Sequence, residues 1–146
     1  MTRKKRSQRL KPVQKLAGQG EKDASRALGQ SQQALAEQEA RLEQLRSYRE
    51  EYRQMFEGKD RAVDPRRLRD ERAFLARLDE VIRQQEGVVQ SNMAEFEDKR
   101  EGWIEARSRV NALDRAAERY RSGEQREQDK REQRDQDELA GRRSQD

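Results

Sequence analysis

The second half of the chain carries apolar residues at alternating steps of three and four positions. From the first of them onward, these positions are Leu75, Leu78, Ile82, Gln85, Val89, Asn92, Phe96, Lys99, Trp103, Ala106, Val110, Leu113, Ala117 and Tyr120. Eleven of the fourteen are apolar, a pattern typical of the seam along which one coiled-coil helix packs on another. It predicts a long helix over residues 65–121. The three polar members either fix the register of packing or are simply tolerated in a narrow seam.

The first half of the chain has a weaker seam of the same kind. Its members are Leu28, Leu35, Leu42, Leu45, Tyr52 and Phe56. Pro12 suits the first turn of a helix, where its missing N–H costs nothing, so a helix is predicted over residues 12–56. A glycine and turn-forming residues follow, and the Asp64-Pro65 pair is typical of an N-cap with proline at the first helical position. The turn is therefore expected at residues 57–64.

A turn this short joins two long helices only in opposite directions. The sequence thus predicts an all-α fold, an elongated antiparallel two-helix coiled-coil hairpin over residues 12–121. Leu42 is expected to face the stretch from Leu78 to Ile82, and Leu16 to face the stretch from Trp103 to Ala106. Residues 122–146 are charged and hold a single leucine, so they are expected to be either a frayed extension of the second helix or disordered.

The residue types that the chain lacks limit its chemistry. It contains no His and no Cys, which excludes a disulfide, a thiolate nucleophile, an imidazole base and the usual zinc site. Carboxylates are numerous, but acid–base catalysis needs a pair whose pKa values are pushed apart, usually by burial, and a thin rod offers little burial. We therefore expect a protein that is not an enzyme and that uses no metal and no cofactor.

The chain also lacks membrane-directed segments and begins with a run of cations. No apolar run approaches the roughly 20 residues that span a bilayer, and there is no signal-peptide core, so a cytoplasmic location is expected. Residues 1–11 hold six cations and no acid. This basic arm could hold nucleic acid, anionic lipid or an acidic partner, or it could be a solvated terminus that aids solubility.

A second apolar stripe lies beside the main seam, close to the expected turn. Its members are Leu45, Tyr48 and Tyr52 in the first helix, flanked by Arg41 and Met55, and Phe74, Leu78, Val81 and Val88 in the second. Antiparallel pairing brings the two parts together as a partly exposed aromatic patch. Such a patch on a charged protein usually marks a binding site; the alternative is a locally thicker seam in which these residues cover one another.

The motifs resemble those of the FliJ family of the bacterial flagellar type III export apparatus, over roughly residues 6–120. The resemblance rests on L-x-x-Y-x-x-x-Y at Leu45, Tyr48 and Tyr52, on F-x-x-x-L-x-x-V at Phe74, Leu78 and Val81, and on W-x-x-A at Trp103 and Ala106. The chain length, the position of the turn and the basic start agree with it. The resemblance implies an antiparallel two-helix coiled coil, similar to the central stalk of rotary ATPases and to the stalk proteins of injectisomes.

The resemblance also implies partners and a location. The family links the hexameric export ATPase to the cytoplasmic domain of the membrane export gate and handles export chaperones. It thereby implies peripheral association, through those partners, with the cytoplasmic side of the cell membrane. The gate-binding positions of the family fall here on Leu45, Tyr48, Tyr52, Phe74 and Leu78, with weaker matches at Val81 and Gln85.

Two other functions stay open at the level of sequence. A nucleic-acid-binding coiled coil would work through the basic arm, but the net charge is only +4 and no aromatic residue lies near the arm to stack on bases. A generic scaffold coiled coil would explain the heptads and not the side stripe. The sequence therefore favours an export component for which nucleic acid is not the partner.

Overall fold

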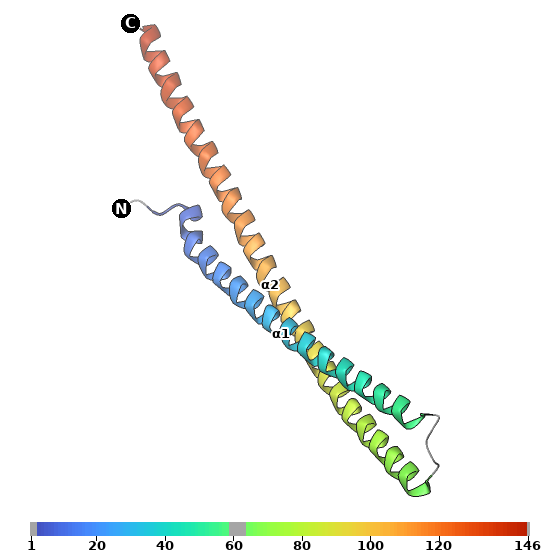
Figure 1. Ribbon diagram of the computed structural model, residues 1–146. Coiled ribbons are helices and arrows are strands. Elements are labelled where there is room, and N and C mark those ends of the chain that lie inside the picture. The colour runs from blue at the N-terminus through green and yellow to red at the C-terminus, as the bar shows by residue number, and fades with distance from the viewer. Residues whose placement is uncertain (1–2, 59–63, 146) are drawn as a thin grey trace. The chain divides into compact units, whose positions relative to one another are not determined.

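The computed structural model describes residues 3–58 and 64–145 and shows two helices. Helix α1 runs over Arg6–Phe56 and α2 over Pro65–Gln145, and within the described ranges there is no strand. The helices pack against each other in opposite directions, which confirms the predicted all-α helical hairpin (Figure 1). Part of the predicted turn, residues 59–63, lies outside the described residues.

The chain divides into two compact units, and both helices contribute to each. The hairpin unit is Ser25–Gly102, and the terminal unit combines the residues up to Ala24 with those from Trp103 onward. All ten positions predicted for the seam are buried or half-buried: Leu28, Leu35, Leu42, Leu75, Ile82, Val89, Phe96, Trp103, Val110 and Leu113.

The hairpin unit is held by a small apolar core with polar contacts on either side. Leu42, Ile82 and Val89 are buried together, and Leu35 and Leu45 pack against them, so Leu42 meets α2 where the sequence predicted. The Gln85 side-chain amide donates to the backbone and side-chain oxygens of Gln38, at 3.0 and 2.8 Å. This polar member of the seam thus makes a specific contact across the hairpin, which fixes the register of the two helices.

The terminal unit combines polar contacts between the helices with apolar side chains of α2, among them the buried Ala117. The Trp103 indole N–H donates to Glu21 at 3.1 Å, and the Gln14 amide donates to Asp114 at 3.0 Å. The prediction that Leu16 packs on Trp103 and Ala106 is wrong, because Leu16 is 74% exposed. Gln14 and Glu21 bond to α2, and a residue at position 16 falls outside the face that they share.

Helix α1 begins at Arg6, six residues before the predicted start at Pro12. The earlier start has a cause on α2: the backbone N–H and the hydroxyl of Ser7 both donate to the Glu124 carboxylate, at 3.2 and 2.6 Å. Pro12 consequently lies inside the helix, where its missing N–H leaves one carbonyl of the preceding turn without its helical donor. The predicted boundary of the basic arm at residue 11 is therefore wrong, since Arg6 to Lys11 are helical.

Helix α2 starts where the sequence predicted and ends much later. The Asp64 side chain accepts a hydrogen bond from the Arg66 N–H at 3.1 Å, which is N-cap geometry ahead of Pro65. At the other end α2 continues to Gln145, so the boundary at residue 121 is wrong; of the two alternatives for residues 122–146, an extension of the second helix is confirmed and disorder is wrong. Every residue from Gln125 to Gln145 is exposed. Gln side chains there bond acids four positions on, in Gln125 with Asp129, Gln128 with Glu132 and Gln133 with Asp137.

The hydrogen bonds from Ser7 to Glu124 make the stability of the fold depend on pH. The Ser7 hydroxyl bond lowers the pKa of Glu124 below its usual value of 4.5, against a smaller opposing effect of desolvation. A carboxyl group whose pKa is lower in the folded state than in the unfolded state stabilises the fold above pH 4.5. This stabilisation is lost as pH falls through the folded-state pKa. Ser7→Ala is therefore expected to return the Glu124 pKa toward 4.5, which an NMR titration of its carboxyl carbon measures. An unchanged pKa would contradict the contact.

Candidate functional site

Four aromatic rings gather where α1 ends and α2 begins. Tyr52 is the centre of this aromatic cluster: its ring centroid lies 4.7 Å from that of Tyr48, 5.8 Å from that of Phe56 and 4.7 Å from that of Phe74. Phe56 and Phe74 are 6.1 Å apart. Phe74 belongs to α2 and the other three rings to α1, so the cluster joins the two helices. Edge and tilted contacts at these distances are the favourable arrangements for aromatic pairs.

The cluster has a covered side and an exposed side. Tyr52, Phe56 and Phe74 are half-buried, whereas Tyr48 is 44% exposed. Tyr52 and Phe56 continue the line of Leu45 along the face of α1 that meets α2, and Tyr48 stands off that line. The Tyr48 hydroxyl donates to the Tyr52 hydroxyl at 3.1 Å, and this bond raises the pKa of Tyr48 above its ordinary value. Tyr48 is thus presented to solvent in a fixed orientation.

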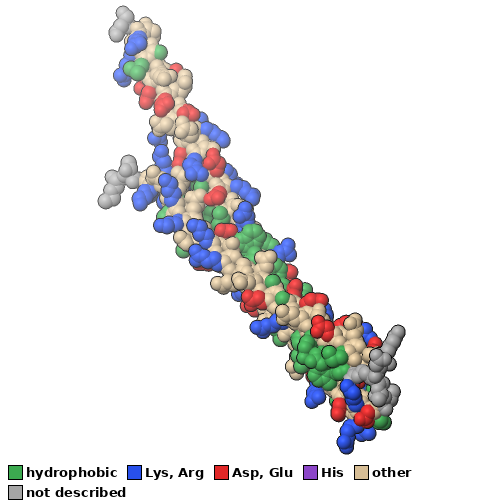
Figure 2. Space-filling view, in the orientation of Figure 1, with side chains coloured by type: hydrophobic (Ala, Val, Ile, Leu, Met, Phe, Trp, Pro, Cys, Tyr) green, Lys and Arg blue, Asp and Glu red, His purple; other side chains and the backbone are tan. Residues whose placement is uncertain are grey.

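Aliphatic side chains extend the cluster on α2. Phe74, Leu78, Val81 and Val88 follow one another at steps that keep them on one side of the helix. Leu78 is half-buried, and Val81 and Val88 are exposed. Figure 2 shows hydrophobic side chains gathered on the surface of this part of the hairpin unit. We call the aromatic cluster together with Leu78, Val81 and Val88 the turn-proximal patch.

A shallow groove adjoins Tyr48 on the outer side of α1. It is lined by Ala40, Glu43, Gln44, Ser47, Tyr48 and Glu51. The floor therefore includes one aromatic ring and small or polar side chains, and two carboxylates stand at its edges. A partner segment that covers Tyr48 could also enter this groove, where a basic side chain would find Glu43 or Glu51.

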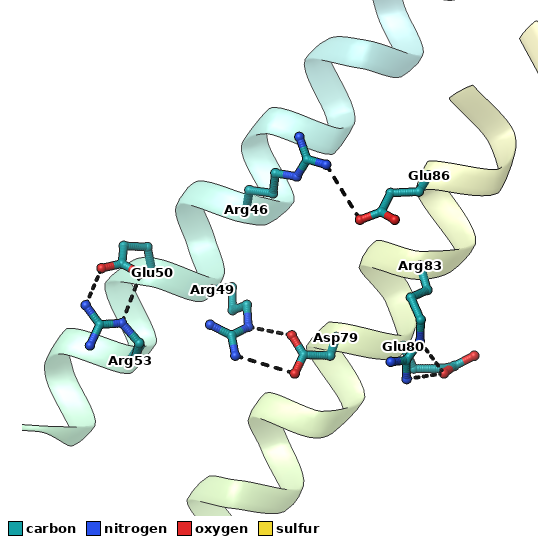
Figure 3. A network of polar contacts seen from close by, with 8 residues as sticks. All are labelled: Arg46, Arg49, Glu50, Arg53, Asp79, Glu80, Arg83 and Glu86. Carbon is teal, nitrogen blue, oxygen red and sulfur yellow. Dashed lines mark hydrogen bonds and ion pairs between the residues drawn. The ribbon is translucent and has the colours of Figure 1, made fainter. Parts of the chain in front are cut away.

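Ion pairs surround the patch and hold the two helices in register. Arg49 reaches from α1 to Asp79 on α2, donating from Nε and Nη2 to the two carboxylate oxygens, and Arg46 reaches Glu86 at 3.6 Å (Figure 3). The hydrogen bond to Asp79 raises the pKa of Arg49. Both pairs are a third or more exposed, so each contributes little to stability. Their main effect is on the alignment of the helices. The bidentate Arg49–Asp79 pair determines which turn of α1 faces which turn of α2.

A second group of ion pairs stays within single helices. Arg53 binds Glu50 and Arg83 binds Glu80 (Figure 3). Arg53 also binds Glu57. The bond from Arg53 lowers the pKa of Glu50. These contacts between residues three and four apart stabilise the last turns of α1 and the first third of α2, in the region that carries the patch.

The structure brings six of the seven residues suggested by the family resemblance to the patch or its edge. Tyr48, Tyr52 and Phe74 lie in the aromatic cluster, Leu78 and Val81 extend it, and Leu45 packs against the core. Gln85 differs, because its amide is engaged with Gln38 across the seam. Sequence reasoning assigned Phe56 only to the seam and missed Gln38 and Arg49. Continuing the three-and-four spacing from Leu35 through positions 38, 42, 45, 49, 52 and 56 would have found all three.

In residues 3–58 and 64–145, no group of three or more acidic side chains is close enough together to hold a metal ion. Over the same ranges, neither helix contains a stretch long and apolar enough to cross a membrane.

Comparison with known proteins identifies a family. The sequence model of the family described as Flagellar FliJ protein matches residues 6–146. No curated protein and no solved structure matches the chain. The family match covers nearly the whole chain, including the part of α2 beyond the motifs that first suggested the resemblance. The chain therefore belongs to the FliJ family and is a component of the flagellar export apparatus.

Proposed function

We propose that the chain is a non-enzymatic adapter that links the flagellar export ATPase to the cytoplasmic domain of the membrane export gate. In this proposal the turn-proximal patch binds the gate, and the ATPase ring and export chaperones bind residues outside the patch. The protein then works in the cytoplasm at the inner face of the cell membrane. The observation that carries the proposal is the aromatic cluster, with Tyr48 held in the open on an otherwise charged surface.

The chemistry of the patch supports a protein partner. Exposed aromatic and aliphatic side chains that adjoin one another are typical of protein–protein interfaces, and Tyr is among the residues that contribute most to binding there. Tyr52 packs against Tyr48, and Phe74 packs against Tyr52 in turn, so the exposed ring needs little ordering when a partner covers it. The arrangement offers a rigid apolar contact with a hydroxyl at its edge.

Tyr48→Ala is expected to weaken binding to the purified gate domain by about 30-fold or more, because a central aromatic contact commonly has an effect of that size. Met93→Ala is the matched control. Met93 is also exposed in the hairpin unit, and it lies about 28 Å along α2 from Phe74. Isothermal titration calorimetry with the full chain measures both affinities.

The binding and stability of these variants separate the proposal from its alternatives. Normal gate binding by Tyr48→Ala, or an equal loss in Met93→Ala, would show that the patch is not the binding site. A lower unfolding temperature of Tyr48→Ala with unchanged binding would make the patch part of the seam. Tyr48→Phe is expected to retain most of the affinity, since it keeps the ring and removes only the bond to Tyr52.

A further inference from the structure

The positive charge of the chain is concentrated in its first turns. Residues 3–20 contain seven cations, Arg3, Lys4, Lys5, Arg6, Arg9, Lys11 and Lys15, and no Asp or Glu. The whole chain has 34 Lys and Arg against 30 Asp and Glu, so the remainder has 27 cations against 30 acids and a net charge of −3. Figure 2 shows Lys and Arg side chains on the surface around the start of the described chain. An attraction to anions is therefore local to this segment.

The helix places these cations beside outward-facing apolar side chains. One face of α1 is used by α2, where Ser7 bonds Glu124, Gln14 bonds Asp114 and Glu21 accepts from Trp103. The other face is open: Arg9, Lys11, Pro12, Val13, Lys15 and Leu16 are all exposed. Successive residues of an α-helix are about 100° apart around its axis. Seen along the axis of α1, Leu16 and Val13 therefore lie near Arg9, and Pro12 lies between Leu16 and Lys15. We call these six residues the basic–apolar face.

We propose that the basic–apolar face binds the surface of an anionic phospholipid membrane directly. Helices that lie on a membrane combine Lys and Arg, which attract acidic headgroups, with apolar side chains that enter the boundary between headgroups and acyl chains. Leu16 is 74% exposed and Val13 is 46% exposed, so both can enter that boundary without leaving a contact in the fold. The proposal is independent of the gate-binding patch, which lies in the other unit.

The exposed aliphatic side chains favour lipid over the other anionic partners. Nucleic acid would attract the same cations through its phosphates, and the Tyr120 ring lies 5.7 Å from the Arg6 guanidinium, but contacts to phosphates and bases have no role for an outward Leu and Val. The acids of α2 that approach this segment do not neutralise its outer face. Asp114 and Glu124 are bonded to Gln14 and Ser7 on the side that faces α2.

Vesicle flotation with the full chain tests the proposal. We expect binding to vesicles that contain phosphatidylglycerol, little binding to vesicles of phosphatidylcholine alone, and weaker binding as salt increases. Lys11→Gln with Lys15→Gln is expected to lower the affinity by about 30-fold, at about fivefold for each cation near the surface. Leu16→Ser is expected to lower it by about tenfold through the loss of apolar burial.

Matched variants on the exposed end of α2 provide the controls. Leu139 is 57% exposed, and Lys130 and Arg134 are exposed cations four positions apart, as Lys11 and Lys15 are. Leu139→Ser and the pair Lys130→Gln with Arg134→Gln are expected to leave vesicle binding unchanged. Circular dichroism should show equal helicity in all variants, because every substituted side chain is exposed.

Other results would overturn the proposal. Absence of binding to the anionic vesicles would do so directly. If the double Lys variant lost binding while Leu16→Ser kept it, the face would be a general polyanion site, and duplex DNA or an acidic protein would be its partner. Equal losses in the α2 controls would show attraction to the whole surface. Gate binding by the Leu16 and Lys variants should stay normal, so a failure here is distinguishable from a failure of the adapter function.

Discussion

Ile82→Ala is expected to lower the free energy of unfolding of the hairpin unit by about 2 to 4 kcal/mol, the usual cost of truncating a large aliphatic side chain in a core. Ile82 is 7% exposed and forms the buried core of this unit with Leu42 and Val89. Whole domains of this size are stable by only about 5 to 15 kcal/mol, so the loss is a large fraction of the total. Urea unfolding followed by circular dichroism measures it.

Val81→Ala is the control for Ile82→Ala. The two residues are adjacent in α2, but Val81 is exposed and belongs to the turn-proximal patch. Its truncation is expected to change stability by less than about 0.5 kcal/mol and to weaken gate binding. Ile82→Ala should show the reverse, with normal binding by the fraction that stays folded. Similar effects of both variants on stability would mean that the seam does not lie where the structure places it.

Trp103→Ala is expected to open the terminal unit while the hairpin unit stays protected. Trp103 is half-buried, its N–H bonds Glu21, and the Arg107 guanidinium lies 5.8 Å from the centre of its ring. Loss of these contacts should cost about 2 kcal/mol, less than a fully buried Trp would. That corresponds to about 30-fold faster hydrogen exchange in residues 6–24. Exchange around Leu42 should not change.

Ile104→Ala tests whether the effect of Trp103→Ala is specific. Ile104 is the next residue in α2 and is exposed, so its truncation should leave exchange in residues 6–24 unaltered. Trp103→Phe keeps a ring in the seam and removes the bond to Glu21, so its effect should be intermediate. Unchanged exchange in Trp103→Ala would show that the polar contacts alone hold the first turns of α1 to α2.

The seam was predictable because it depends on periodicity. Large side chains such as Ile82 and Phe96 repeat at a spacing that only a long helix can place on one face, and the chain offers no competing apolar pattern. The start of α2 was predictable for a local reason, since an Asp before a Pro satisfies the first free N–H groups of a helix. Both signals lie within a few turns of the residues that they position.

The start of α1 depends on a contact that is distant in sequence. Pro12 is a good local reason to start a helix, but the carboxylate of Glu124 caps Ser7 from the other helix and stabilises an earlier start. Leu16 was expected to face the stretch from Trp103 to Ala106 because of the register of antiparallel pairing, whereas Gln14 and Glu21 make the hydrogen bonds to α2. Apolar character alone does not identify the seam here, because α2 contributes apolar side chains such as Trp103 and Ala117 to the terminal unit while α1 meets them in part with polar ones.

Most residues of the candidate site were predictable from the sequence, but the hydrogen bonds between their side chains were not. The stripe spacing brought Tyr48, Tyr52 and Phe74 together, because antiparallel pairing fixes which turns meet near the loop. The hydroxyl pair of the two tyrosines and the engagement of Gln85 with Gln38 depend on rotamers across the helix pair. The spacing of residues in the sequence does not determine these two contacts, because several rotamers fit each position on a half-exposed helix.

The end of α2 tolerates insertions and deletions that the paired parts of the two helices do not. From Gln125 onward the side-chain bonds run between residues three or four apart in the same helix, so inserted or deleted residues would leave equivalent bonds at any length. Inside the paired helical stretches Arg6–Phe56 and 65–124, an insertion must come close to seven residues, or the seam downstream rotates away from its partner. We therefore expect natural and engineered changes in length to accumulate after Glu124, which is also where a fluorophore or a fused domain can be attached without changing how α1 pairs with α2.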